Sequence, residues 1–303
     1  MSRLLILGAS GDQGHAQVLR ALAAGHQVRI GLRDPAKGAR LFGAAVEAVP
    51  LDFADAASLR EAMQGIDTVL ANFPSSSFNP AEPLLAAAAA TGDSARAAGV
   101  ELILFNTSMP LRTQPLGFAG HDARLAMVDA TAQAGVPMVV FNPVVFMGNL
   151  LRGWAWPGIA RHGRFEYPHA ADLDVSWVCQ EDLASLMVTA VGRGDLGGRR
   201  FAVGGPETLR GADVARSLSH VLGRPIEFVP QEIDAFCAAI RPQLRIADAA
   251  LRDHMLGELA RIYRWYNESP ERPFTVDMRP TLAALPVSLT RFEDWAAAQN
   301  WQR

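Results

Sequence analysis

A glycine turn near the start of the chain restricts its possible folds more than any other part of the sequence. The apolar run Leu4–Leu7 is typical of a parallel strand buried on both faces, and it leads directly into Gly8–Gly14. Apolar side chains then recur on one helical stripe, at Val18, Leu19 and Leu22. Glycines at every third residue allow a tight turn, and the N–H groups that begin the next helix can bind a pyrophosphate. The residues expected to contact a dinucleotide here are Gly8, Ser10, Gly11, Asp12, Gln13 and Gly14.

Strands and helices are predicted to alternate along the first half of the chain. This alternation indicates an α/β fold, a Rossmann-type doubly wound parallel sheet with right-handed crossovers. Such sheets bind their ligands beyond the carboxyl ends of the strands, so the residues that follow each strand are candidate site residues. Strands are predicted over residues 4–7, 27–32, 45–51, 67–71, 102–105, 138–141 and 200–203.

The regular alternation ends near residue 150. The segment 151–170 is rich in glycine, proline and aromatic residues, and much of the chain after residue 205 is helical in pattern. We therefore expect an NAD(P)-binding Rossmann domain over residues 1–150, to which 171–204 returns. A smaller, mainly helical substrate-binding domain would be formed by 151–170 and 205–303.

The composition excludes several classes of function. The net charge is −3, so the positive surface expected of a nucleic-acid or anionic-membrane binder is missing. No stretch approaches the ~20 apolar residues of a membrane helix, and the histidines show no metal-ligand spacing. Cys179 and Cys237 form no close motif, which is typical of a reducing compartment. We expect a cytoplasmic monomer or homodimer that binds a small-molecule substrate, with no metal, nucleic-acid or membrane partner.

Arg33 ends the second strand, at the position that distinguishes the two nicotinamide dinucleotides. An acidic residue there binds the ribose hydroxyls of NAD, whereas an arginine can pair with the 2′-phosphate of NADP. Asp34 follows directly, but the pattern favours NADP(H) over NAD(H). Asp52, after the third strand, is expected to accept a hydrogen bond from the adenine amino group, and the alternative is a turn or helix-cap role. The other cofactor candidates at strand ends are Asn72, Phe73, Asn106 and Thr107.

The catalytic pair of short-chain dehydrogenases is missing. Those enzymes use a tyrosine four residues before a lysine, which lowers the tyrosine pKa for proton exchange. The single lysine here is Lys37, in the cofactor region, and no tyrosine precedes Tyr167. Near the equivalent place stand His121, which can act as an acid near neutral pH, and Arg124, which can hold a ribose or a substrate but cannot exchange protons. The alternative is a plain helix start with Asp122 in its first turn.

A substrate pocket is expected around residue 150, where aromatic and amide side chains gather. Aromatic residues line most small-molecule pockets, and the alternative is that these rings simply pack in a core. The candidate substrate-binding residues are Asn142, Phe146, Asn149 and Trp154.

Several segments together resemble the NmrA-like group of atypical short-chain dehydrogenases. That group includes NADPH-dependent quinone reductases, isoflavone-reductase-like enzymes and redox-sensing regulators. The resemblance covers nearly the whole chain. The segments that carry it are Gly8–Gly14, Gly31–Pro35, Leu51–Phe53, Ala134–Pro137, Asn142–Leu150, Gly205–Glu207, Leu218–Pro225, Ile262–Glu268 and Phe292–Trp295.

The resemblance implies NADP bound across Gly8–Gly14, Arg33, Asp52 and Asn72–Phe73, with a substrate cleft between the large and small domains. Reductases of this group usually carry a lysine at the position of Arg124, which puts proton chemistry in doubt. Hydride transfer to a quinone-like acceptor can proceed when water or His121 supplies the proton. The expected function is therefore an NADPH-dependent reductase of a small carbonyl, enone or quinone-like substrate. The alternative is a non-catalytic, NADP-sensing regulatory protein of the NmrA type.

Overall fold

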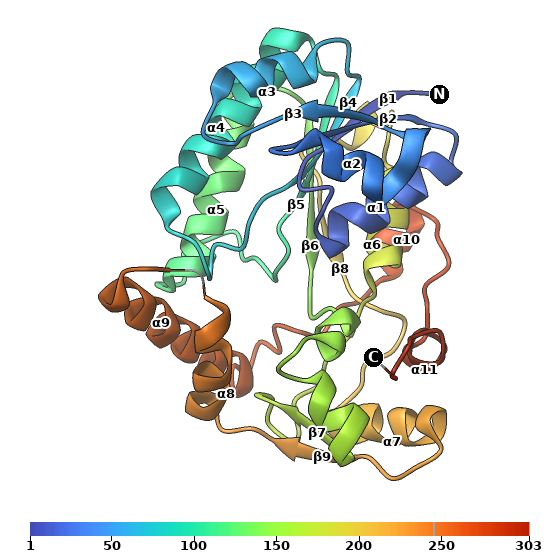
Figure 1. The fold of residues 1–303 in the computed structure, drawn as a ribbon, viewed down its shortest axis with the longest axis vertical. Coiled ribbons are helices and arrows are strands. Elements are labelled where there is room, and N and C mark those ends of the chain that lie inside the picture. Colours follow the sequence, from blue (N-terminus) through green and yellow to red (C-terminus); the bar gives the residue numbers. More distant parts are fainter. Residues whose placement is uncertain (245, 303) are drawn as a thin grey trace. The chain divides into compact units, whose positions relative to one another are not determined.

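The chain folds into two units, and the first is assembled from three separate segments (Figure 1). The computed structural model describes residues 1–244 and 246–302. Unit 1 contains Met1–Pro143, Gln180–Ala202 and Arg279–Val287. The predicted Rossmann domain therefore collects two later parts of the chain.

A parallel sheet forms the centre of unit 1. Its seven strands are β1 (Arg3–Ile6), β2 (Gln27–Leu32), β3 (Glu47–Pro50), β4 (Thr68–Asn72), β5 (Leu102–Asn106), β6 (Met138–Pro143) and β8 (Arg200–Val203). They lie in the order β3-β2-β1-β4-β5-β6-β8, of which the first six follow the order of dinucleotide-binding sheets. All pairs from β3 to β6 are parallel. The predicted fold class and the predicted strands are confirmed, with ends that shift by one or two residues.

Helices cover both faces of this sheet. Helices α3, α4 and α5 pack side by side on one face, while α1 and α6 pack against each other on the other face (Figure 1). The helices of unit 1 are α1 (Asp12–Ala23), α2 (Pro35–Phe42), α3 (Ala56–Met63), α4 (Ala81–Ala98), α5 (Ala119–Ala132), α6 (Gln180–Thr189) and α10 (Arg279–Ala284), with short turns η1 (Gly43–Ala45) and η4 (Gly194–Leu196).

The strands are buried on both faces because their apolar residues are continuous. Alternate residues such as Leu5, Val69 and Ile103 join the core formed with α3, α4 and α5. Leu4 and Ile6, which point to the opposite face, are also fully buried. The interior of the sheet therefore has no place for a polar ligand, and polar site residues lie where the strands end.

Helix α2 follows β2 directly. It begins because Asp34 caps it: the Asp34 Oδ1 atom accepts a hydrogen bond from the Ala36 N–H at 3.0 Å. Pro35 occupies the first helical position, where its fixed φ and missing N–H cost nothing. The segment that carries Lys37 is thus a helix rather than an open cofactor loop.

Unit 2 combines a small sheet with helices. Its segments are Val144–Cys179, Val203–Met278 and the part of the chain from Ser288. Strands β7 (Arg164–Tyr167) and β9 (Glu227–Pro230) pair in parallel, in a register that aligns their first residues. Its helices are α7 (Gly211–Leu222), α8 (Ile233–Ile240), α9 (Ala249–Glu268) and α11 (Phe292–Ala297), with short turns η2 (Met147–Leu151), η3 (Gly158–His162) and η5 (Arg241–Gln243).

The boundaries of the two units differ from the expected ones. The change from unit 1 to unit 2 falls after Pro143 instead of residue 150, and the returning segment is Gln180–Ala202 instead of 171–204. Arg279–Val287, expected in the smaller domain, belongs to unit 1. It is tied there because the Thr281 hydroxyl donates to the Ala202 carbonyl at 2.9 Å, at the edge strand β8.

Two further expectations concern membranes and metals. Within residues 1–244 and 246–302, every helix is too short or too polar to cross a bilayer. The same residues contain no group of three histidine, cysteine or acidic side chains placed to hold a metal ion.

Candidate functional site

The glycine turn between β1 and α1 has the shape that a dinucleotide pyrophosphate requires. Gly8 adopts φ +68°, a left-handed conformation that favours glycine. A Cβ atom on Gly14 would lie 2.4 Å from the Gly8 carbonyl oxygen, so the start of α1 packs directly on the turn. No side chain caps the N-terminus of α1 at Gly11, which leaves the positive end of the helix dipole for a ligand anion. The residues present here fit a bound dinucleotide.

Arg33 and Asp34, which follow β2, differ in their interactions. Both carboxylate oxygens of Asp34 are engaged, one by the Ala36 N–H and the other by Arg40 at 3.0 Å. Arg33 is exposed, and its guanidinium makes no hydrogen bond or ion pair within the described part of the chain. An arginine therefore remains for a ligand phosphate, while the neighbouring acid belongs to helix α2.

Asp52 forms the turn after β3. Its Oδ1 atom accepts a hydrogen bond from the Ala54 N–H at 3.0 Å, and its main chain is tied to the Ser58 hydroxyl. This is the turn role that the sequence left open as an alternative. The expected contact with adenine stays a prediction, since the Asp52 side chain is also exposed at the strand end.

A chain of buried amide side chains links the ends of β1, β4 and β5. The Asn72 Nδ2 atom donates to the Leu7 carbonyl at 2.9 Å and to Gln17 Oε1 at 2.7 Å. The Asn72 Oδ1 atom accepts from Gln17 Nε2 at 2.9 Å and from Asn106 Nδ2 at 2.8 Å. Asn106 and Gln17 are 0% exposed. The ends of β4 and β5 are thus hydrogen-bonded to α1 beside the glycine turn.

Two backbone groups fix the orientation of every amide in this chain. The Leu7 carbonyl requires a donor from Asn72, and the Ser108 N–H donates to Asn106 Oδ1 at 2.9 Å. Asn106 must then present its Nδ2 to the next member, Gln13 Oε1, which also accepts from the Ser108 hydroxyl at 2.9 Å. Ser108 is held at φ 59°, a conformation that non-glycine residues adopt only when their surroundings impose it.

The amide chain changes the expected roles of the strand-end residues. The polar atoms of Asn72 and Asn106 bond to other protein groups, so contacts with a cofactor from these positions would have to come from the backbone. Phe73 packs its ring 5.4 Å from Phe105, and Thr107 donates to the Met109 carbonyl at 2.7 Å. Both side chains are buried. These four residues lie at the expected edge of the sheet, but their side chains are buried and contact other protein groups instead of facing a ligand.

Gln17 was not among the expected site residues. It lies one helical turn after Gln13, so the two amides share a face of α1. The two amides four residues apart, directly after a glycine turn, are the sequence feature from which this role of Gln17 could have been predicted.

His121 uses both of its ring nitrogens inside the protein. Its Nε2 atom accepts a hydrogen bond from the Arg112 N–H at 3.0 Å, so the proton of the neutral ring is on Nδ1. Nδ1 lies 2.8 Å from Asp122 Oδ1 and donates to it. The side chain is 1% exposed. His121 would have to break one of these bonds to pass a proton to a substrate, so the geometry favours a role in holding the loop before α5.

Arg124 is the second residue expected to be catalytic, and it is also 1% exposed. Its Nη2 atom donates to the Pro74 carbonyl, two residues past the end of β4, at 2.6 Å. Its Nε and Nη1 atoms are buried without a hydrogen-bond partner among the residues that the structure describes. The structure thus brings Arg124 to the same edge of the sheet as Asn72.

The expected substrate residues fall in both units. In unit 1, the Asn142 Oδ1 atom is buried and has no hydrogen-bond partner in the described part of the chain. In unit 2, Asn149 donates to the Tyr167 hydroxyl at 3.2 Å, and the Trp154 ring lies 5.2 Å from that of Tyr167. Phe146 is 5% exposed. Their contact with a substrate stays a prediction, and the core-packing alternative describes Phe146 best.

His169 belongs to the same aromatic cluster of unit 2 and makes its stability depend on pH. Its ring lies 4.4 Å from that of Tyr167, and the residue is 4% exposed. Its Nε2 atom has no hydrogen-bond partner within residues 1–244 and 246–302. Burial lowers the His169 pKa to about 3. Below the unfolded value of about 6.5 the unfolded chain binds a proton that the folded one does not, so stability falls by about 1.4 kcal/mol per pH unit as pH decreases.

Urea unfolding at pH 7 and pH 5 tests this expectation. In the unaltered protein His169 should lower the free energy of unfolding by about 2 kcal/mol between the two pH values, and His169→Phe should remove this contribution. Tryptophan fluorescence isolates unit 2, because all six tryptophans lie in its segments. His162→Phe, at an exposed position, is the matched control. An identical pH dependence in His169→Phe and the unaltered protein would contradict the assignment.

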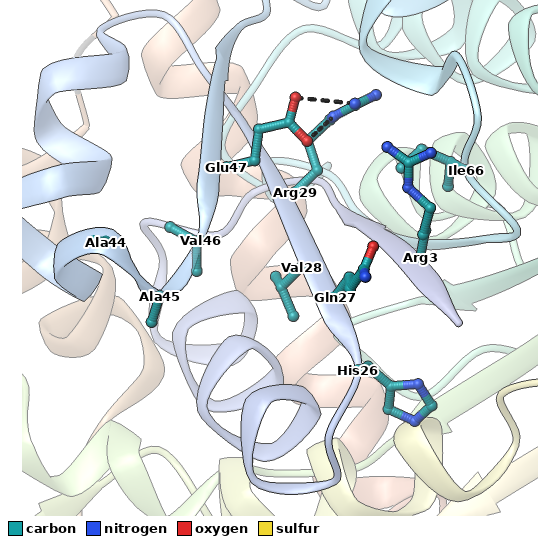
Figure 2. A pocket seen from close by; sticks show the side chains of 10 residues that line it. All are labelled: Arg3, His26, Gln27, Val28, Arg29, Ala44, Ala45, Val46, Glu47 and Ile66. Atoms are coloured by element: carbon teal, nitrogen blue, oxygen red, sulfur yellow. Dashed lines mark hydrogen bonds and ion pairs between the residues drawn. The ribbon is translucent and has the colours of Figure 1, made fainter. Parts of the chain in front are cut away.

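A hollow of about 410 Å³ lies elsewhere in unit 1. Figure 2 shows that it is lined by residues at the amino ends of the strands, among them Arg3 of β1, Gln27 of β2 and Glu47 of β3. Its Arg29 is engaged in an ion pair with Glu47 at 2.9 Å. This edge is opposite to the glycine turn, and parallel sheets of this kind bind ligands at the carboxyl edge. The hollow is therefore not the dinucleotide site.

Comparison with known proteins gives matches over almost the whole chain. The NmrA-like family matches residues 1–296. A (4-alkanoyl-5-oxo-2,5-dihydrofuran-3-yl)methyl phosphate reductase from Streptomyces griseus is 32% identical over 239 residues, which cover 78% of this chain and 80% of that protein. The NADPH complex of a quinone oxidoreductase from Escherichia coli superimposes with a TM-score of 0.74 at 20% identity, covering 97% of this chain and 98% of that one. NmrA, a negative transcriptional regulator in complex with NADP, gives 0.74 at 17% identity, covering 98% and 94%.

Proposed function

Because this chain belongs to the NmrA-like family, we propose that it is an NADP(H)-dependent reductase of a small carbonyl, enone or quinone-like substrate. The observation that carries the proposal is the glycine turn: Gly8 and Gly14 let the start of α1 pack directly on the turn, and Gly11, at the uncapped start of the helix, leaves space for a pyrophosphate. The Streptomyces griseus relative, a reductase of a phosphate-bearing dihydrofuranone, supports the reaction class.

The preference for NADP(H) over NAD(H) rests on Arg33. Its guanidinium is exposed at the end of β2 and has no protein partner within the described residues. Asp34 caps α2 and pairs with Arg40, so it does not compete for the ribose. A free arginine at this position supports binding of a 2′-phosphate through charge-assisted hydrogen bonds.

Bound NADPH supplies a hydride, and one proton from water completes the two-electron reduction of the substrate. The amide chain from Gln17 to Gln13 keeps the edge of β4 and β5 rigid while this happens. Arg124 lies beyond the end of β4, and its N–H groups that have no partner among the described residues would contact the bound substrate. His121 holds the Arg112 backbone against α5 and leaves the proton to water.

The contribution of unit 2 is proposed from its amide and aromatic groups. Asn149 and Trp154 are half-buried and contact Tyr167, so they can present one polar and one apolar surface to a planar substrate. Cys179 and Cys237 are buried and form no disulfide within the described residues, which supports a cytoplasmic location.

The test is consumption of NADPH by the purified protein with a panel of small quinones and enones. We expect NADPH oxidation well above an enzyme-free blank, with an equal amount of reduced product. A protein that binds NADPH in titration but leaves the whole panel unreduced would disprove the reductase.

A second candidate is an NADP-sensing regulator without catalysis. It is favoured by the single lysine of the chain, Lys37, and by the absence of any tyrosine before Tyr167. The same assay separates the two functions, because a sensor binds NADP and NADPH but turns over neither.

A further inference from the structure

Arg124 is a buried charge without a counter-charge. It is 1% exposed, and the Pro74 carbonyl is its sole hydrogen-bond partner among the described residues. A guanidinium has five N–H donors, and burying a charge is costly unless it is paired. The Arg124 side chain is therefore incomplete in the protein alone.

No acidic side chain within residues 1–244 and 246–302 supplies the missing charge. Asp122, two residues earlier, has its oxygens bonded to the N–H groups of Leu116 and Gly117 and to His121. Burial lowers the pKa of Arg124 to about 10, with no acidic group opposing this effect, and the guanidinium remains charged at neutral pH. The described side chains do not neutralise this guanidinium, whereas an anionic group of a ligand can.

The position of Arg124 indicates which part of a ligand meets it. A dinucleotide in a sheet of this order lies across the carboxyl edge, from β2 and β3 toward β4 and β5. Arg33 after β2 and the glycine turn after β1 would bind its phosphates. Arg124 is anchored to Pro74, beyond the end of β4. The nicotinamide end of a dinucleotide bound in this direction, and the substrate beside it, would therefore lie on the side of Arg124.

We infer that the substrate carries an anionic group, a carboxylate, phosphate or sulfonate next to the reducible bond, and that Arg124 binds this group. This inference rests on the proposed reductase function and adds a substrate class to it. The planar guanidinium matches two oxygens of such a group, whereas a neutral quinone offers one carbonyl oxygen. The anion completes the buried charge that the fold leaves unpaired.

The experiment compares a benzoquinone carboxylate with its methyl ester in the full-length protein. In the unaltered protein we expect kcat/KM for the carboxylate to exceed that for the ester about 10- to 100-fold, the range for a charge-assisted hydrogen bond. Arg124→Met should bring this ratio close to one, and Arg124→Lys should keep part of it. Arg96→Met, an exposed arginine of α4, is the matched control and should keep the full ratio.

Calorimetric titration of the carboxylate into the NADP⁺-saturated protein reads binding without turnover. Binding that is lost in Arg124→Met and partly kept in Arg124→Lys supports the anion site, even when no substrate is reduced and the reductase proposal fails. Turnover with no preference for the carboxylate, or equal losses for both probes in Arg124→Met, overturns the inference while the reductase stands. A loss of NADP⁺ affinity as large as the loss of carboxylate affinity also overturns it, because Arg124 would then serve the cofactor. If Arg124→Met does not fold, Arg124→Lys decides by the same ratio.

Discussion

Gly14→Ala is expected to abolish NADPH binding and to destabilise unit 1. The new methyl group would lie 2.4 Å from the Gly8 carbonyl oxygen and 2.8 Å from the Ala9 Cα atom, both backbone atoms that cannot turn away. Gly8 has little room to move away, because it packs so closely on Asn72 that a Cβ atom built on it would lie 2.7 Å from the Asn72 carbonyl oxygen. Overpacking of this kind costs about 1–3 kcal/mol or more. Far-UV circular dichroism on heating and NADPH titration measure the two effects.

Gly11→Ala separates binding from folding at the same turn. Its methyl group would meet one protein atom, the Gly8 carbonyl oxygen, at an ordinary contact distance of 3.4 Å. We expect a melting temperature near that of the unaltered protein but weakened NADPH binding, because the second glycine of such a turn lets the pyrophosphate approach the backbone.

Gly257→Ala, in α9, controls for the substitution itself, since its Cβ would face open space. Unchanged NADPH affinity in Gly11→Ala would show that the pyrophosphate lies elsewhere. Unchanged stability in Gly14→Ala would refute the packing argument.

The parts of the fold that follow from local pattern were predictable from the sequence. Buried parallel strands read as continuous apolar runs, so the sheet was expected nearly residue by residue. Helix α2 was not expected: the Asp34 cap and Pro35 fix its start, and its buried residue is Gly38, which is not a helix-forming signal. The β7–β9 pair joins segments about sixty residues apart, Arg164–Tyr167 and Glu227–Pro230. The local sequence of either strand does not predict which strand it pairs with.

The site was predictable in position but less so in function. Strand ends must lie at the carboxyl edge, so Asn72, Asn106 and Thr107 were placed there correctly. The side chains of Asn72 and Asn106 bond to each other, and Asn72 also bonds to Gln17. These contacts depend on which atoms meet between separate elements of the fold, and the sequence alone does not show them. The same holds for Arg124: its sequence position suggests catalysis, but the missing counter-charge becomes visible only when its surroundings are known.

Arg33→Ala is expected to reverse the preference between the two dinucleotides. Removal of a charge-assisted contact to a phosphate should weaken NADPH binding by about 10- to 100-fold. NADH has no 2′-phosphate, so its affinity should change by less than about threefold, the scale of an exposed charge. Fluorescence titration of both reduced cofactors, at one salt concentration, gives the ratio directly.

Arg40→Ala shows whether the effect belongs to Arg33 or to the positive charge of the region. Arg40 is exposed and pairs with Asp34 at 3.0 Å, so it contributes to the local potential without being free for a phosphate. We expect Arg40→Ala to change NADPH affinity by less than about threefold, because an exposed ion pair contributes little. Equal weakening of NADPH in both variants would mean a diffuse electrostatic attraction. Equal weakening of NADPH and NADH in Arg33→Ala would mean that Arg33 contacts a part common to both cofactors, and the basis for preferring NADP(H) would be lost.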